Sequence, residues 1–187
     1  ILSRVFTNVD FSNEKFPFMT FKFVDYLNAQ IRILRASFTG EIGYEIYVPP
    51  KHALKLWERI FYFSRDINLT PYGTETMHLL RAEKGYIIVG QDTDGTVTPI
   101  DLNLSWMIGK NKKDFIGKRS LSRSDIVKSD RKQLVGLVPV NKTYGIEEGQ
   151  HVVEEEKIST PIKKPVRMLG QVTSSYFSPT LNHSVAM

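Results

Sequence analysis

The sequence predicts an α+β fold, in which strands and helices occupy separate parts of the chain. Three observations lead to this prediction. Several segments of the first fifty residues are rich in aromatic and β-branched side chains, which are typical of strands. Two segments between 51 and 84 carry apolar residues at helical spacing. From residue 133 onward, short strand-like segments alternate with proline and glycine, which indicates a small β-rich subdomain.

The first strands are predicted at 19–26 and 30–38. Because only Leu27-Asn28-Ala29 connects these two strands, we expect them to form a hairpin. A third strand is predicted at 41–48, where a period of two places Ile42, Tyr44, Ile46 and Val48 on one face, which we expect to be the buried one. Side chains of a strand alternate between its faces, so the face opposite to the apolar residues carries Glu41, Gly43, Glu45 and Tyr47.

An amphipathic helix is predicted at 51–65, with Pro50 suited to its first turn. A second helix is predicted from Thr70-Pro71 to about Lys84, and Gly85 just beyond it is the residue that commonly ends a helix. Residues 86–110 are rich in turn-forming residues, and a short basic helix is predicted from Gly117 to Ile126.

The remaining chain predicts short strands at 133–140, 151–153 and 170–177, and the last residues from Ser184 resemble the opening of another strand. We therefore predict two domains, 1–130 and 131–187, and expect the second to be truncated. The chain begins with Ile1 rather than methionine, and we interpret it as a piece of a longer polypeptide.

Composition excludes several classes of site. The chain has no cysteine, which excludes disulfides and thiolate-bound metals and suits a reducing, cytoplasmic location. The twelve glycines include no G-x-G pair, so no dinucleotide-binding fingerprint is present. The four histidines are widely separated, which predicts no metal site. No apolar run approaches the roughly 18 residues that a membrane span needs, so no membrane association is expected.

The segment 37–48 is the strongest candidate for chemistry. Glu41 and Glu45 flank Gly43, which has no side chain and would let a flat ring approach the backbone. A carboxylate accepts two parallel hydrogen bonds from an N–C–N edge such as that of a pterin or a guanine. Taken alone, the segment favours two glutamates that face solvent on a half-buried strand over a binding site.

The same segment resembles the folate-binding strand of the glycine-cleavage T-protein, an aminomethyltransferase. The matching residues are Phe38-Thr39-Gly40-Glu41-Ile42-Gly43-Tyr44-Glu45. In that family the last glutamate holds the pterin of tetrahydrofolate, and it corresponds to Glu45. The resemblance also places Phe38 and Trp106 beside the folate. It implies that the fold is the C-terminal part of an aminomethyltransferase folate-binding domain followed by a small β-barrel-like subdomain.

Further motifs are similar to the α subunit of the heterotetrameric sarcosine oxidases. They lie at 73–86, 90–99, 114–120 and 170–176. This resemblance implies a domain that captures the one-carbon unit of oxidised sarcosine on tetrahydrofolate, as 5,10-methylenetetrahydrofolate. FAD, FMN and NAD are then expected only in absent parts of the parent enzyme, and the isolated chain is expected to be inactive. Folate and the other oxidase subunits are the implied partners.

The candidate cofactor-binding residues are Glu45, Phe38, Trp106, Glu41 and Arg81. Arg81 also suits a structural role, because it lies in the last turn of a predicted helix. Met77 stands where many T-proteins carry a folate-contacting arginine, so that contact is not carried over. The catalytic aspartate of the family corresponds to a position upstream of this chain, and we assign no catalytic residue.

Alternative functions remain open at this stage. The chain could be a folate-binding or subunit-assembly module without catalysis, or the tail of a dimethylglycine oxidase or dehydrogenase or of a T-protein-like aminomethyltransferase. A basic stretch at 110–132 could attract a small polyanion or an acidic subunit. Its charges are interleaved with only one aromatic residue, Phe115, so nucleic acid is not an expected partner.

Overall fold

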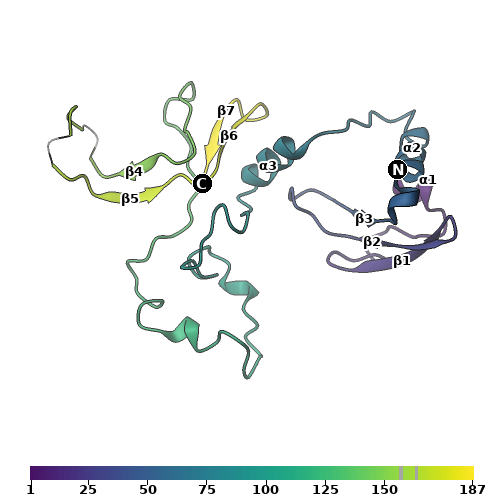
Figure 1. Ribbon diagram of the computed structural model, residues 1–187, viewed down its shortest axis with the longest axis horizontal. Coiled ribbons are helices and arrows are strands. Elements are labelled where there is room, and N and C mark those ends of the chain that lie inside the picture. The colour runs from purple at the N-terminus through teal and green to yellow at the C-terminus, as the bar shows by residue number, and fades with distance from the viewer. Residues whose placement is uncertain (156–157, 163) are drawn as a thin grey trace. The chain divides into compact units, whose positions relative to one another are not determined.

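The computed structural model describes residues 1–155, 158–162 and 164–187. The chain forms two compact units, Ile1–Lys84 and Gly85–Met187. Their helices and strands are labelled in Figure 1, and each unit is described by itself. Within the described residues, no helix is long and apolar enough to cross a membrane.

The first unit contains a three-stranded antiparallel sheet in the order β1-β2-β3. The strands are β1 (Phe21–Tyr26), β2 (Ala29–Leu34) and β3 (Glu45–Tyr47). The predicted hairpin between the first two strands is confirmed. Its two turn residues, Leu27 and Asn28, have φ values of 47° and 61°, as the type I′ turn that matches strand twist requires.

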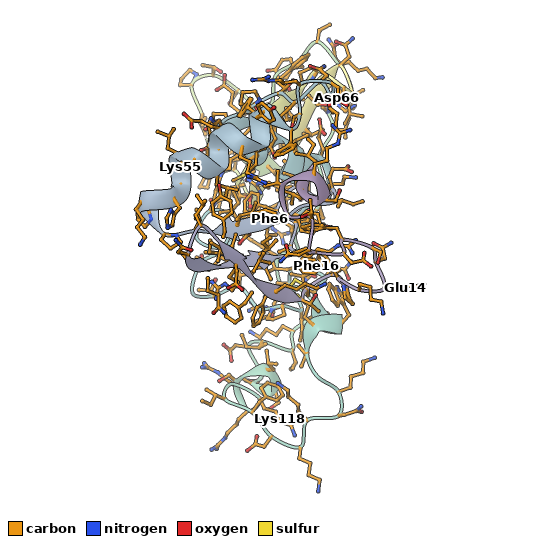
Figure 2. All side chains as sticks on the ribbon, turned by 90° about the vertical axis from the view of Figure 1, so that its right-hand side faces the viewer. Phe6, Glu14, Phe16, Lys55, Asp66 and Lys118 are labelled. Carbon is orange, nitrogen blue, oxygen red and sulfur yellow. The ribbon has the colours of Figure 1, made fainter. Side chains whose placement is uncertain are left out.

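One face of this sheet packs against helices, as Figure 1 shows. Val24, Ile31 and Ile33 of the sheet are buried together with Leu56 of α2 (Pro50–Tyr62) and with Val5 of α1 (Leu2–Val5). The helix predicted at 51–65 is confirmed, and Pro50 lies in its first turn. Figure 2 labels Phe6 and Phe16, which belong to this core, and Lys55, which is exposed on α2.

The second predicted helix forms, but it begins later than expected. α3 spans Thr74–Glu83, so its predicted start at Thr70-Pro71 is wrong. Residues 71–73 are not helical, and Gly73 precedes the first turn with an extended backbone (φ −94°, ψ −177°). The predicted end is confirmed: Gly85 follows the helix with a φ of 71°, a conformation that costs glycine little.

The third strand is much shorter than the predicted span 41–48. Gly40 turns the chain with a φ of 79°. A Cβ on Gly43 would lie 2.6 Å from the carbonyl oxygen of Ala36, so the backbone folds back on itself there. Residues 36–44 therefore form a loop. Consistent with this, Ile42, which was expected on the buried face, is 80% exposed.

The second unit contains two separate two-stranded sheets, one of β4 and β5 and one of β6 and β7. The strands are β4 (His151–Val153), β5 (Met168–Gln171), β6 (Ser175–Ser178) and β7 (His183–Ala186). The strands predicted at 151–153 and from Ser184 are confirmed. The subdomain is rich in strands, as expected of a barrel, but its described strands do not close into one.

Three predicted elements of this unit differ in the structure. The predicted strand 170–177 is divided between β5 and β6. The N–H of Val172 donates to the carbonyl of Gln150, next to β4, whereas the N–H of Thr173 donates to the carbonyl of Met187, next to β7. At this point the chain passes from one sheet to the other. The strand predicted at 133–140 is reduced to one bridge between Leu137 and Ala186, and Pro139 has no N–H to continue a ladder.

The basic helix predicted at 117–126 is also wrong. The structure forms a single 3-10 turn there, η2 (Ser120–Ser122). The hydroxyl of Ser122 donates to the carbonyl of Arg119 at 2.9 Å. Serine side chains compete for backbone groups in this way, which lowers helix propensity.

Candidate functional site

The face of the sheet opposite to the helices presents its side chains to solvent. Two rows of side chains cross all three strands, Phe21-Leu34-Glu45 and Phe23-Arg32-Tyr47. We call these six residues the open sheet face. The rings of Phe21 and Phe23 meet edge to face with centroids 5.4 Å apart, and both are more than half exposed. The face therefore combines aromatic surface with one carboxylate and one guanidinium.

Glu45 is the acidic group of the open sheet face. Its side chain is exposed, and its Oε2 accepts a hydrogen bond from the hydroxyl of Tyr47. The Tyr47 ring is in turn covered by Arg32, whose guanidinium carbon lies 4.3 Å from the ring centroid. The hydrogen bond to Glu45 is the main reason that the pKa of Tyr47 is raised above its usual value. Glu45 is thus an accessible carboxylate whose orientation is set by its neighbours.

Glu41 does not share the open sheet face with Glu45, which corrects the prediction from alternation. It lies in the loop before β3, and its Oε1 is 2.8 Å from Nζ of Lys84. The stem of Lys84 passes close to Gly40, where a Cβ would lie 2.6 Å from Lys84 Cγ. Glu41 therefore fastens the loop to the C-terminal end of α3. Gly43 makes room for the backbone of Ala36, whereas the sequence suggested room for a ring.

Phe38 and Arg81 differ in accessibility. Phe38 lies in the same loop as Glu41 and is 40% exposed, so its ring is available to a ligand. Arg81 lies in the last turn of α3 and is fully buried. The burial of Arg81 supports the structural role at the end of the helix that the sequence also indicated for this residue. Its assignment as a ligand contact stays a prediction that rests on the resemblance.

Trp106 belongs to the second unit. It lies in the 3-10 turn η1 (Ser105–Met107) and is 72% exposed. Three of the five sequence-predicted residues, Phe38, Glu41 and Glu45, thus come from the single segment 38–45 of the first unit.

Glu45 is the only residue of the open sheet face that was predicted as a site residue. Arg32 and Tyr47, which form the contacts beside it, were not predicted. Alternation along 41–48 did place Tyr47 on the face of Glu45, and this was the only signal in the sequence. Arg32 could not be found in this way, because its position opposite Tyr47 depends on the pairing of β2 with β3.

The second unit holds two buried carboxylates, Asp92 and Asp101, beside a cavity of about 660 Å³. Asp92 accepts hydrogen bonds from the backbone of Ile88 and from the hydroxyls of Thr173 and Ser174. Asp101 is paired with Arg131 through two contacts of 2.8 and 2.6 Å. Because both carboxylates bind groups of their own unit, we interpret them as residues that stabilise its fold.

No metal centre is evident in the part of the chain that the structure describes, where no three His, Asp or Glu side chains are gathered closely enough to hold an ion.

Comparison with known proteins assigns the family. A model described as the GCVT N-terminal domain matches residues 1–112, and one described as the glycine cleavage T-protein C-terminal barrel domain matches residues 132–187. The chain belongs to the glycine cleavage T-protein family. Its open sheet face and loop 36–44 both lie within the part that the first of these models matches.

Within that family, the chain is similar over its whole length to sarcosine oxidase subunit alpha of Corynebacterium sp. (strain P-1), with 47% identity. It spans 19% of that subunit. It is also 35% identical to the aminomethyltransferase of Halothermothrix orenii, over 85% of the chain and 41% of the relative. The crystal structure of glycine cleavage system aminomethyltransferase T from Bartonella henselae matches 83% of the chain and 40% of its own length, with a TM-score of 0.69 and 31% identity. These comparisons confirm the resemblance seen in the sequence.

Proposed function

We propose that this chain is the folate-binding, one-carbon-transfer part of a sarcosine oxidase α subunit. Its similarity to such subunits covers the whole chain, although the chain spans only about a fifth of their length. The observation that carries the proposal is that the Glu45 carboxylate is exposed and accepts a hydrogen bond from Tyr47. The resemblance in sequence makes Glu45 the counterpart of the pterin-holding glutamate of the family.

The residues of the open sheet face fit a pterin. An ionised carboxylate has about four acceptor positions, so Glu45 can receive the N–C–N edge of the pterin while it keeps the bond from Tyr47. The exposed rings of Phe21 and Phe23 offer flat apolar surface on the same face. Tetrahydrofolate, when bound, would supply the amine that captures the one-carbon unit as 5,10-methylenetetrahydrofolate.

The proposed roles follow the accessibility of each residue. Glu45 orients the pterin and Phe38 forms part of its wall, whereas a folate contact of Trp106 rests on the resemblance alone. Glu41 acts through the loop that it fastens to Lys84, and Arg81 supports the end of α3 from within. Holding the acceptor close to the one-carbon unit would account for most of the rate gain, because proximity removes the entropic cost of the encounter.

The remaining parts of the reaction are proposed to lie outside this chain. Oxidation of sarcosine would take place at a flavin in another part of the parent enzyme, where FAD, FMN and NAD would bind. We therefore expect the isolated chain to have no oxidase activity. We also propose the other oxidase subunits as its protein partners.

Substitution of Glu45 by glutamine in the complete gene product tests the proposal. The change keeps the shape of the side chain and removes its charge and one acceptor. Because a charge-assisted hydrogen bond contributes roughly 1.5–3 kcal/mol, folate binding should weaken about 10- to 100-fold. Sarcosine oxidation should continue, with free formaldehyde replacing 5,10-methylenetetrahydrofolate as the product. Calorimetric titration with tetrahydrofolate and the formaldehyde yield measure these two effects.

Glu41→Gln is the matched control, because it removes an equal charge four residues away that is paired with Lys84. It should change folate affinity much less than Glu45→Gln. Equal affinity in the parent and in Glu45→Gln would reject the folate site on this strand. If Glu41→Gln alone weakened binding, the correspondence with the family motif would be out of register.

A further inference from the structure

The Glu45 carboxylate is supported by a neighbouring side chain of its own strand before any ligand binds. A glutamate on an exposed strand ordinarily samples several rotamers, and a ligand must immobilise it on binding. In this structure Tyr47, two residues further along β3, already donates its hydroxyl to Glu45 Oε2. A group that is held in its binding orientation before the ligand arrives gives higher affinity, since less freedom is lost.

Tyr47 is itself held in place. It lies directly opposite Arg32 in the pairing of β2 with β3, and the guanidinium carbon of Arg32 is 4.3 Å from the centre of its ring. An arginine in this position attracts the face of an aromatic ring. The three side chains therefore form a chain of contacts on the open sheet face, from Arg32 through Tyr47 to Glu45.

We propose that Tyr47, held by Arg32, is a positioning residue that fixes the Glu45 carboxylate in the orientation that receives the pterin. The inference rests on the proposed function, because it requires Glu45 to bind folate. Tyr47 acts through Glu45 and need not touch the ligand. Its hydroxyl occupies one acceptor position of Oε2, and the carboxylate retains acceptor positions for a pair of parallel N–H groups.

The experiment is a double-mutant cycle in the complete gene product, with tetrahydrofolate as the probe. Tyr47→Phe removes the hydroxyl and keeps the ring on which Arg32 lies. Alone, it should raise the dissociation constant of tetrahydrofolate about 3- to 10-fold. In the E45Q background the same change should have less than about a 2-fold effect, because residues that act through one another do not contribute additively.

Tyr62→Phe provides the matched control. Tyr62 is an exposed tyrosine at the end of α2, and its loss of a hydroxyl should leave folate affinity unchanged. Thermal unfolding of each variant shows whether the fold is kept. A merely structural role of Tyr47 would lower the unfolding temperature without producing the dependence on Glu45.

The outcomes separate this proposal from the one on which it rests. If Glu45→Gln weakens binding and Tyr47→Phe weakens it only when Glu45 is present, the positioning role is supported. If Glu45→Gln weakens binding while Tyr47→Phe has no effect, or an equal effect in both backgrounds, the positioning role is overturned and the folate site stands. If Glu45→Gln leaves binding unchanged, both proposals fail.

Discussion

At the scale of single residues, Asp101 is the clearest case of a side chain whose environment fixes its charge. Only 4% of its side chain is exposed, and Arg131 approaches both of its oxygens. The N–H and the hydroxyl of Thr98 also donate to it. The hydrogen bonds from Arg131 are the main reason that the pKa of Asp101 is lowered to about 2. The pair ties residues 98–101 to residue 131 within the second unit.

This pKa predicts a dependence of stability on pH. Because the pKa is lower in the folded state than its ordinary value of 3.8, the ionised pair stabilises the fold above about pH 4. This contribution should disappear as the pH falls from about 4 to about 2. A difference of nearly two pKa units corresponds to about 2 kcal/mol. We expect Asp101→Asn to lower the free energy of unfolding by roughly that amount at pH 7, and by much less at pH 2.

Urea unfolding at the two pH values measures this effect. The chain has two tryptophans, so Trp106 reports on the second unit once Trp57 is replaced by phenylalanine. Asp130→Asn is the control, because Asp130 is an exposed aspartate near the same arginine in sequence. A loss of stability that is equal at pH 7 and pH 2 would contradict the assignment of the effect to the ion pair.

At the scale of elements, the loop 36–44 determines where Glu45 enters the sheet. It turns at Gly40, is fastened to α3 through Glu41 and Lys84, and packs at Gly43 against the carbonyl of Ala36. Because β3 begins directly after this loop, Glu45 is the first residue of the chain to pair with β2 after the loop, opposite Leu34. The loop 36–44 therefore helps to determine the position of the Glu45 carboxylate.

Gly43→Ala tests this role. The new methyl group would lie 2.6 Å from a backbone oxygen, which cannot move aside as a flexible side chain can. Overpacking of this kind costs about 1–3 kcal/mol, so the free energy of unfolding of the first unit should fall by that amount. Urea unfolding followed through Trp57, in a Trp106→Phe background, measures it. Gly73→Ala is the control, since a methyl group there meets nothing within 4 Å; an equal loss in both variants would argue against the clash.

The elements that could be predicted from the sequence were those with a strong local signal. The β1–β2 hairpin and α2 follow from their own periodicity, and Gly85 marks the end of α3. The strand predicted at 41–48 was too long, because the approach of Gly43 to Ala36 is a tertiary contact that alternation does not reveal. The candidate site followed the same rule. Glu45 could be predicted from its motif, whereas the position of Arg32 opposite Tyr47 depends on the register between two strands.

At the scale of the whole molecule, charge is concentrated in one stretch. Residues 110–132 contain nine lysines and arginines and three aspartates, a net charge of +6, while the whole chain carries +5. All lysines and arginines of the stretch are exposed except Arg131, and Ile116 among them is fully exposed. Lys118, labelled in Figure 2, lies on this loop. The rest of the chain is therefore nearly neutral, so this stretch is the strongest candidate for long-range attraction to a polyanion.

We expect this stretch to attract an acidic partner, either another subunit of the oxidase or the polyglutamate tail of folate. Exposed charges are screened over about 10 Å at 0.1 M salt, so such an association should weaken steeply between low and high salt. Sedimentation of the complete gene product with its partner subunits, at about 50 and 500 mM NaCl, measures the first possibility. Titration with mono- and polyglutamyl tetrahydrofolate at both salt concentrations measures the second.

Replacing Lys112 and Lys113 by glutamine should reduce the salt dependence of whichever association depends on the stretch, because two of its nine cations are lost. The matched control replaces Lys51 and Lys55, which are exposed on α2 of the first unit, and it should leave that dependence unchanged. The two double variants remove the same charge, so a difference between them reports location and not net charge. If both associations were independent of salt, or if both variants weakened them equally, residues 110–132 would be a solvated surface without a binding role.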